Sequence, residues 1–202
     1  MLVILNNYFG RQFNSLNDVS INPRNHEIYF TDTLYGFWQD FRPPPGLRNG
    51  VYRFNPATGF VSSVTDEVVS PNGLTFSPDG SYAYVTDTGA GRGFLDPVPT
   101  DPTTIYRFDV QDDGTWENKK VFAYASPGLP DGIHCDSKGN VYSGCGDGVQ
   151  VWNESGVLLG KIFLGTTSAN FNFAKGGRMV ICAETELYYV QIAAEGNYVQ
   201  GE

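Results

Sequence analysis

The fold is decided by a stretch that occurs three times: Leu16-Asn17-Asp18-Val19, Pro71-Asn72-Gly73-Leu74 and Pro130-Asp131-Gly132-Ile133. In each copy an Asn or Asp precedes a short apolar strand. The first two copies then continue alike, through a turn and a second strand that ends on Thr31-Asp32-Thr33 or Thr86-Asp87-Thr88. Repeats spaced by a few tens of residues indicate a propeller or a solenoid, so the repeat is the first guide to the fold.

Each copy opens a unit of short apolar runs separated by turn residues. Val51-Tyr52-Arg53-Phe54-Asn55 returns in the second unit as Ile105-Tyr106-Arg107-Phe108-Asp109, and such alternation is typical of strands. Aligning Phe173 with Phe76 places a fourth unit at about residues 170–191. We predict four antiparallel strands in each unit, a further strand at residues 2–9 and no long helix. The expected fold is all-β, a β-propeller with about four blades in a single domain over residues 1–202.

Composition limits the partners. The net charge is −9 and no basic run is present, which excludes nucleic acid and anionic membrane as expected partners but suits a metal cation. No stretch approaches the roughly 20 apolar residues of a membrane helix. Residues 1–5 are too short for a signal-peptide core, so the chain as written is expected to be cytoplasmic.

The cysteines show no metal or redox spacing. Cys135, Cys145 and Cys182 form no CxxC pair, and an odd number argues against a full disulfide framework. We interpret them as small buried strand residues. One bridge, from Cys135 to either Cys145 or Cys182, stays open at this point.

The repeated polar residues have a geometric consequence. The innermost strand of a propeller blade lines the central channel, so residues at the starts of these strands gather at one mouth of it. Asn17, Asn72 and Asp131 are therefore expected to form a ring. Amide and carboxylate oxygens are the ligands of hard cations such as Ca²⁺, which disfavours zinc as an obligate structural ion. The alternative is that each residue only makes a turn.

The series LND, SPNGLTFSPDG, TDT, IYRFD and LPDGIHCDSKGNVY resembles the SMP-30/gluconolactonase (regucalcin-like) family, nearest the fungal lactonohydrolases. The resemblance runs from about Asn6 to Val190. It implies a six-bladed propeller that hydrolyses lactones with one divalent cation, usually calcium. Carried over, it implies Asn72 and Asp131 as metal ligands and Asn17 as a ligand or substrate contact. Fungal relatives are often exported, so the compartment is left open.

Two features depart from this family pattern. Residues 1–16 contain no Asp or Glu, so the Glu that contributes an early metal ligand in the family has no counterpart. About four blades are expected instead of six, and an open ring would leave an unpaired edge through which copies could self-associate. We therefore expect metal binding weaker than in full-length relatives, with Asp131 as the only charged residue of the ring.

The expected activity is hydrolysis of a sugar-type lactone. Asp131 is the expected base and metal ligand, with Ca²⁺ as the first choice of ion and Zn²⁺, Mg²⁺ and Mn²⁺ as alternatives. Asn17, Asn170 and Trp38 are the candidate substrate contacts. Trp38 lies in the irregular stretch 34–50, which is either a lid or a packed loop.

Several residues and functions are set aside. We interpret His134 as a packed histidine rather than a proton shuttle, and Asp32 and Asp87 as hydrogen-bonding residues at strand ends. A non-catalytic propeller that serves as a binding scaffold is the main alternative function. A metal-free propeller resembling strictosidine synthase is disfavoured by the Asn/Asp ring.

Overall fold

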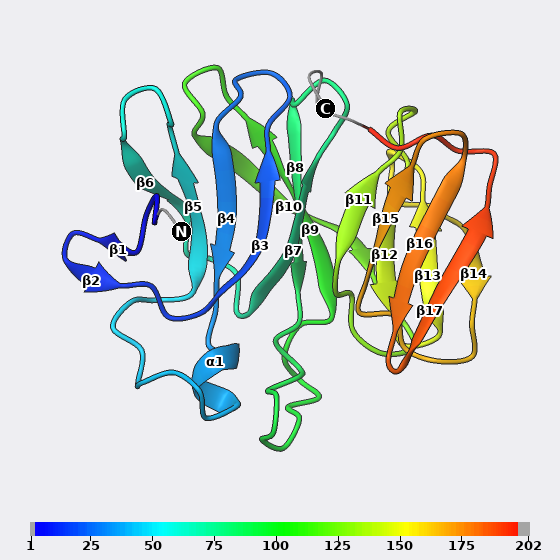
Figure 1. The fold of residues 1–202 in the computed structure, drawn as a ribbon, viewed down its shortest axis with the longest axis horizontal. Helices are drawn as coiled ribbons and strands as arrows, with labels where there is room; N and C mark the ends of the chain where they lie inside the picture. The colour runs from blue at the N-terminus through cyan, green and yellow to red at the C-terminus, as the bar shows by residue number, and fades with distance from the viewer. Residues whose placement is uncertain (1–2, 198–202) are drawn as a thin grey trace.

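The fold is nearly all β-strand. The computed structural model describes residues 3–197, whose main antiparallel sheets follow one another along the chain as blades of a β-propeller (Figure 1). Blade 1 consists of β3 (Leu16–Ile21), β4 (Ile28–Asp32), β5 (Gly50–Phe54) and β6 (Val61–Thr65). Blade 2 consists of β7 (Pro71–Phe76), β8 (Tyr82–Asp87), β9 (Thr104–Val110) and β10 (Trp116–Tyr124). Blade 3 consists of β11 (Ile133–Cys135), β12 (Val141–Cys145), β13 (Gly148–Trp152) and β14 (Leu158–Phe163). Blade 4 consists of β15 (Asn170–Ala174), β16 (Arg178–Ala183) and β17 (Glu186–Gln191).

The propeller with four blades is confirmed, with two corrections of detail. Blade 4 has three strands within residues 3–197, not four. The strand predicted at residues 2–9 is only β1 (Asn7–Tyr8), which pairs with β2 (Arg11–Gln12). It ends early because Phe9 and Gly10 adopt positive φ and reverse the chain; Leu2 lies outside the described residues. A single helical turn, α1 (Tyr35–Trp38), interrupts the stretch 34–50.

The innermost strands of all four blades face one central channel. Val19 of β3, Phe76 of β7, His134 of β11 and Phe173 of β15 line the same cavity, whose volume is about 460 Å³. Aromatic side chains also fill the space between blades. Tyr29 of blade 1, for example, stacks on blade 2, since its ring lies nearly parallel to the Trp116 ring at 5.6 Å. Phe76 belongs to both regions, since its ring also packs against Tyr29 of blade 1 at 4.9 Å between ring centroids.

The cysteines are free. Cys135 and Cys145 are buried and Cys182 is exposed, so neither of the bridges left open forms. Burial raises the pKa of the Cys135 thiol and raises that of Cys145 to about 12. The interpretation as buried strand residues is confirmed for Cys135 and Cys145 and wrong for Cys182, which lies on the uncovered face of the last blade.

The two Thr-Asp-Thr stretches tie each inner strand to the rest of its blade. Asp32 accepts backbone hydrogen bonds from Asn14 and Ser15 at 3.0 and 2.7 Å. Asp87 does the same for the residues before β7, at 2.9 and 2.9 Å. The prediction that both aspartates are hydrogen-bonding residues at strand ends is confirmed.

Hydroxyl groups hold the starts of the inner strands in place. The ladder register shifts between Leu16 and Val19, and again at the same place in β7, so the backbone there needs other partners. Thr31 Oγ1 accepts from the amide of Asp18 at 3.0 Å and donates to the Asn72 carbonyl at 2.8 Å. Thr86 repeats the arrangement one blade later. A hydroxyl hydrogen bond thus passes from blade 1 to blade 2 and from blade 2 to blade 3 at the channel mouth.

Both ends of the arc present apolar side chains to solvent. Leu16, Val19 and Ile21 of β3 are exposed on blade 1, and Leu187 and Tyr189 are exposed on blade 4. The opposite face of each of these blades packs against its neighbour. Within the described part of the chain, no helix is long and apolar enough to cross a membrane.

Candidate functional site

Asp131 lies at the channel mouth, just before β11. Its backbone amide donates to the Gly144 carbonyl at 2.8 Å, and its carbonyl accepts from Thr86 Oγ1 at 2.9 Å. With the backbone held on both sides, the position of the carboxyl group is fixed by the blades rather than by a free loop. Burial raises the pKa of Asp131 to about 6; a hydrogen bond from the Asn72 side chain lowers it and the negative charge of Asp18 raises it further.

Asp18 is a second carboxylate of this site, and the sequence prediction missed it. Its Oδ2 accepts from the Leu74 amide of blade 2 at 2.7 Å, and its Oδ1 accepts from the Val19 amide at 2.8 Å. Burial raises the pKa of Asp18 to about 6, against the lowering effect of these two hydrogen bonds. The expectation that Asp131 is the only charged residue of the ring is therefore wrong.

The repeat itself contained a signal for Asp18. The second and third copies have glycine at its position, because the chain is crowded there. A Cβ on Gly73 would lie 2.4 Å from the Asp131 carbonyl oxygen, and one on Gly132 would lie 2.3 Å from Asn170 Oδ1. In the first copy the position is a carboxylate that reaches the next inner strand. A charged residue at the glycine position of this repeat therefore indicates a polar site.

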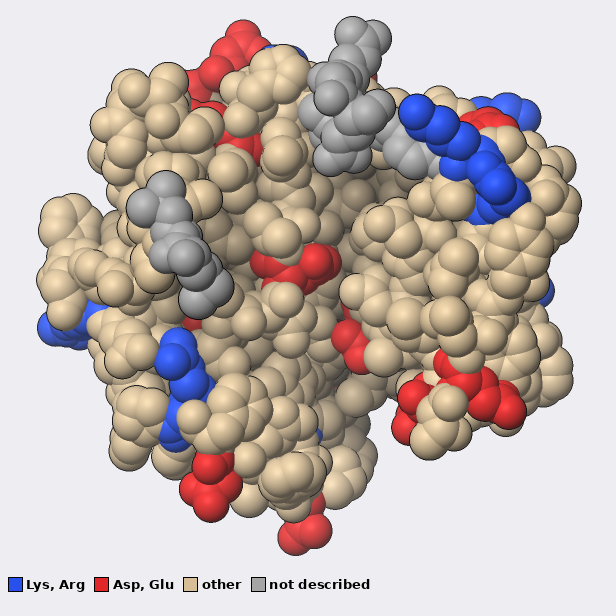
Figure 2. All heavy atoms as spheres, viewed as in Figure 1, with Lys and Arg blue, Asp and Glu red and all other residues tan. Residues whose placement is uncertain are grey.

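The negative charge of the two aspartates is not compensated by the protein. No ion pair among residues 3–197 involves Asp18 or Asp131. Figure 2 shows acidic side chains in the hollow at the centre of the viewed face, without lysine or arginine beside them. Buried carboxylates are normally paired or bound to a metal. Two carboxylates beside an amide oxygen form a hard donor set that fits a divalent cation such as Ca²⁺.

The channel mouth lacks a cluster of three ionisable ligands. Within residues 3–197, no group of three His, Cys, Asp or Glu side chains is placed to hold a metal. Asn72, which is buried, and water would have to complete the coordination of any ion at Asp131. The oxygen ligands of calcium include amide carbonyls and water, so the donors at the mouth are of the chemical type that calcium accepts.

Helix α1 brings a further residue to the mouth that the sequence prediction missed. The Tyr35 hydroxyl pairs with Thr88 Oγ1 of blade 2. Burial raises the pKa of Tyr35; hydrogen bonding to Thr88 lowers it, and the charge of Asp131 raises it. Trp38 packs edge-on against Tyr35 at 5.5 Å between ring centroids. Trp38 is therefore a packing neighbour of Tyr35, and the charge of Asp131 acts on the Tyr35 hydroxyl.

The remaining predicted residues lie at different distances from this centre. Asn72 and Asp131 are brought together, as the ring predicted. Asn17 is exposed, and its side chain has no hydrogen-bond partner in the described part of the chain. Asn170 lies against Gly132, next to Asp131 in the chain. His134 packs edge-on against Phe171 at 5.1 Å, and burial lowers its pKa, which agrees with a packed histidine.

The fold and the mouth define a class of protein: a β-propeller with a polar, oxygen-rich site where its inner strands begin. Residues 3–185 match the model of the SMP-30/Gluconolactonase/LRE-like region, and the chain belongs to this family.

Curated relatives are lactonases. The chain is 37% identical over 193 residues to lactonohydrolase oryL of Aspergillus oryzae, an alignment covering 87% of this chain and 43% of that protein. It is 30% identical over 169 residues to a gluconolactonase of Zymomonas mobilis, covering 79% of this chain and 44% of that one. The chain thus spans less than half the length of both relatives.

Solved structures agree on the fold. The gluconolactonase XC5397 of Xanthomonas campestris superposes with a TM-score of 0.80 at 30% identity, over 95% of this chain and 60% of that chain. A calcium-binding regucalcin of Agrobacterium tumefaciens superposes with a TM-score of 0.66 at 16% identity, over 90% of this chain and 62% of its own. The second likeness concerns the fold alone.

Proposed function

We propose that the channel mouth hydrolyses a lactone of the sugar type to the hydroxy acid, with the help of a divalent cation, Ca²⁺ before Zn²⁺, Mg²⁺ or Mn²⁺. The single observation that supports it best is the pair of half-buried carboxylates without an ion-pair partner among the described residues, Asp18 and Asp131, beside the Asn72 amide. The names of the curated relatives supply the reaction class.

The chain offers oxygen ligands from separate inner strands. Asp131 and Asn72 would hold the cation, and Asn17 is the further ligand or substrate contact implied by its place in the repeat. Asp18 adds the second negative charge that a divalent ion requires. When bound, such a cation polarises an ester carbonyl and lowers the pKa of a water molecule.

Asp131 is the proposed general base. Hydrolysis forms a bond between a water oxygen and the lactone carbonyl carbon, breaks the ring C–O bond, and leaves the ring oxygen as a hydroxyl. Asp131 accepts the proton that the attacking water loses, and that proton is then delivered to the departing ring oxygen. A pKa raised to about 6 by burial suits a base at neutral pH; a nearby cation would lower this pKa and reduce the base strength.

Substrate recognition is assigned to groups around the mouth. Tyr35 and Asn170 can exchange hydrogen bonds with the hydroxyl groups of a sugar lactone. Trp38 packs edge-on against the Tyr35 ring and would offer an apolar surface to the substrate. Burial keeps the Tyr35 hydroxyl protonated at neutral pH, because its pKa is raised above the ordinary value.

The proposal is tested by following acid release from glucono-δ-lactone in a pH-stat, with calcium and with EDTA. We expect a rate above background in calcium, lost both in EDTA and in Asp131→Ala. A rate that is unchanged by EDTA and by Asp131→Ala would contradict it.

The alternative is a non-catalytic scaffold that acts by association. The observation in its favour is the exposed apolar surface at both ends of the arc, including Val19 at 62% and Leu187 at 71% exposure. Large exposed apolar surface marks interaction sites. Under this alternative, sedimentation velocity would show concentration-dependent dimers that Leu187→Asp abolishes, and the pH-stat would show no catalysed hydrolysis.

A further inference from the structure

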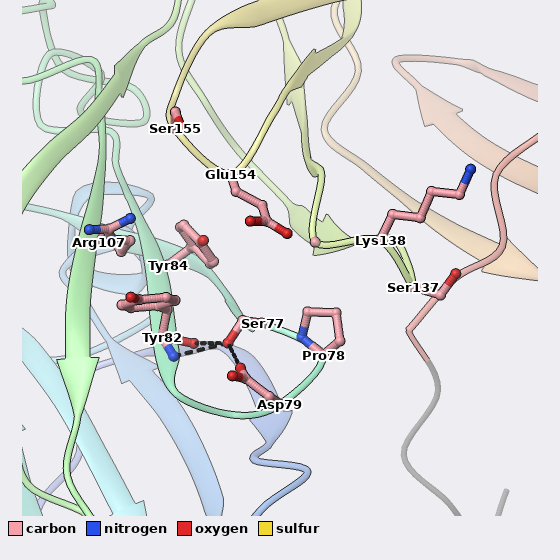
Figure 3. A pocket seen from close by; sticks show the side chains of 11 residues that line it. Ser77, Pro78, Asp79, Tyr82, Tyr84, Arg107, Ser137, Lys138, Glu154 and Ser155 are labelled. Carbon is pink, nitrogen blue, oxygen red and sulfur yellow. Dashed lines mark hydrogen bonds between the residues drawn. The ribbon is translucent and has the colours of Figure 1, made fainter.

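A groove lies between blades 2 and 3, at the end of the blades opposite the channel mouth. Figure 3 shows its lining, and its volume is about 430 Å³. Tyr82 and Tyr84 of β8 and Arg107 of β9 form one wall, and Glu154 comes from the turn between β13 and β14. The six residues of β7 separate this end from the mouth, a distance of roughly 20 Å at about 3.3 Å per residue.

The repeat provides an internal comparison for this groove. In the register of the sheets Tyr29 pairs with Arg53 in blade 1, as Tyr84 pairs with Arg107 in blade 2. Between blades 1 and 2 this pair is satisfied by the protein. Asn25 Nδ2 donates to the Tyr29 hydroxyl at 3.0 Å, and Arg53 forms an ion pair with Glu27 at 3.5 Å.

Between blades 2 and 3 the same pair lacks such partners. Tyr84 is 1% exposed, and its hydroxyl makes no hydrogen bond to any residue in the range 3–197. Tyr82 takes the place that Glu27 has in blade 1, and the Arg107 guanidinium stacks over the Tyr82 ring at 4.4 Å. Arg107 forms no ion pair within that range either. The Tyr84 hydroxyl is not among the fully buried polar atoms that lack a partner; Tyr84 lines the open groove, where solvent or a ligand can reach the hydroxyl.

Glu154 completes the set of unpartnered groups. A Cβ on Gly139 would lie 2.6 Å from Glu154 Oε1, so glycine at this turn leaves room for the carboxylate. Glu154 makes no hydrogen bond or ion pair with the described residues. Burial raises the pKa of the Tyr84 hydroxyl; among the weaker causes, the charge of Arg107 lowers this pKa and the charge of Glu154 raises it. Figure 3 shows Tyr84 between Arg107 and Glu154.

The other charged groups of the groove narrow the choice of ligand. Asp79 is already engaged, since Ser77 Oγ and Ser81 Oγ donate to it at 2.6 and 2.7 Å. Lys138 extends away from Tyr84 (Figure 3) and adds positive charge at the rim. Asp79 keeps its negative charge, because hydrogen bonds from hydroxyl groups stabilise a carboxylate without neutralising it, and it offsets the charge of Lys138. Arg107 and Glu154 remain as the charged groups on either side of Tyr84 (Figure 3), the first suited to a ligand carboxylate and the second to a ligand hydroxyl.

We propose that this groove binds a small polyhydroxylated carboxylate. The ligand carboxylate lies against the guanidinium of Arg107, which binds planar carboxylates well. One ligand hydroxyl donates to Glu154, and a neighbouring hydroxyl pairs with the Tyr84 hydroxyl. The ligand thereby supplies the hydrogen bond and the negative charge that Asn25 and Glu27 give to Tyr29 and Arg53 between blades 1 and 2. This site is separate from the channel mouth and does not require lactone hydrolysis there.

The test is a calorimetric titration of the full chain with sodium gluconate in EDTA, which removes any cation-dependent binding at the mouth. We expect saturable binding that Arg107→Gln weakens at least about 10-fold and Tyr84→Phe weakens about 3-fold or more, as loss of charged and neutral hydrogen bonds implies. Arg53→Gln, the matched change between blades 1 and 2, and Asp131→Asn are expected to bind as the parent does. Thermal melts establish that each variant is folded.

The results that would overturn the proposal are equally definite. Absence of gluconate binding by the folded parent would end it. Binding that survives both Arg107→Gln and Tyr84→Phe would place the ligand elsewhere. Binding lost in Asp131→Asn would place it at the channel mouth. The titration measures binding and not turnover. Its outcomes can therefore be interpreted even if the pH-stat shows no lactone hydrolysis.

Discussion

Thr86 in blade 2 donates a hydrogen bond from Oγ1 to the backbone carbonyl of Asp131 at 2.9 Å, and the same oxygen accepts from the Gly73 amide at 2.7 Å. One hydroxyl therefore fixes both the shifted start of β7 and the residue proposed as the base. Thr31 makes the corresponding pair of contacts one blade earlier. The site is thus positioned by a contact that recurs between blades.

Thr86→Val removes this hydroxyl at nearly constant shape. Gly73 and Asp131 each lose a buried partner, so we expect the free energy of unfolding to fall by about 1–3 kcal/mol and the rate of lactone hydrolysis to fall with it. Chemical denaturation and the pH-stat measure the two effects. The exposed Thr167 is the control position, and equal stability of Thr86→Val and Thr167→Val would contradict the assigned role.

Asp18→Asn tests the second carboxylate. The amide oxygen can still accept from Leu74, and only the exposed hydrogen bond from the Val19 amide is lost, so the fold should persist. One of two negative charges at the mouth is removed. We expect the affinity for Ca²⁺, measured by calorimetry, to fall at least about 10-fold, while the metal-free melting temperature stays equal or rises because repulsion with Asp131 is relieved. An unchanged calcium affinity would remove Asp18 from the site.

The pH dependence of the metal-free chain follows from the same two groups. Burial raises the pKa of Asp18 and of Asp131 from 3.8 to about 6 in the folded state. The folded state thus holds protons more tightly than the unfolded state. The stability that comes from protonating these two carboxyl groups is fully present below pH 3.8 and is lost as the pH rises through about 6.

In EDTA we therefore expect the free energy of unfolding to be larger at pH 5 than at pH 7.5 by about 1.4 kcal/mol for each of the two groups, because only about one pH unit of the interval lies below the folded-state pKa of about 6. Asp32 and Asp87 also have raised pKa values and contribute with the same sign. The comparison is consequently made between the parent and Asp18→Asn, which should show the smaller dependence. Saturating calcium should weaken the parent's dependence, and a parent curve equal to that of Asp18→Asn would count against the assignment.

Tyr35→Phe tests the proposed role of the Tyr35 hydroxyl, which α1 places at the channel mouth, in binding the lactone. The variant keeps the ring against Trp38 and loses the hydrogen bond to Thr88. We expect a higher KM for the lactone and a loss of about 1 kcal/mol of stability. Phe37→Leu changes an exposed side chain of the same helical turn and serves as the control. A KM unchanged in Tyr35→Phe would leave Tyr35 a packing residue.

The repeated stretches were sufficient to predict the blades, because the spacing of polar starts and apolar strands survives without knowledge of contacts. They also placed Asn72 beside Asp131. They did not reveal Asp18, because its importance lies in a hydrogen bond to Leu74 from the neighbouring blade. Tyr35 was missed for a related reason: α1 is one turn long and has no helical periodicity to detect.

The central claim is that Asp131 and a divalent cation hydrolyse a lactone at the channel mouth. Its most direct measurement is the initial rate with glucono-δ-lactone in the pH-stat across buffered free calcium, for the parent and for Asp131→Asn. We predict a rate that rises and saturates with calcium in the parent and stays at background in Asp131→Asn. A parent rate independent of calcium, or an Asp131→Asn rate equal to that of the parent, would contradict the claim.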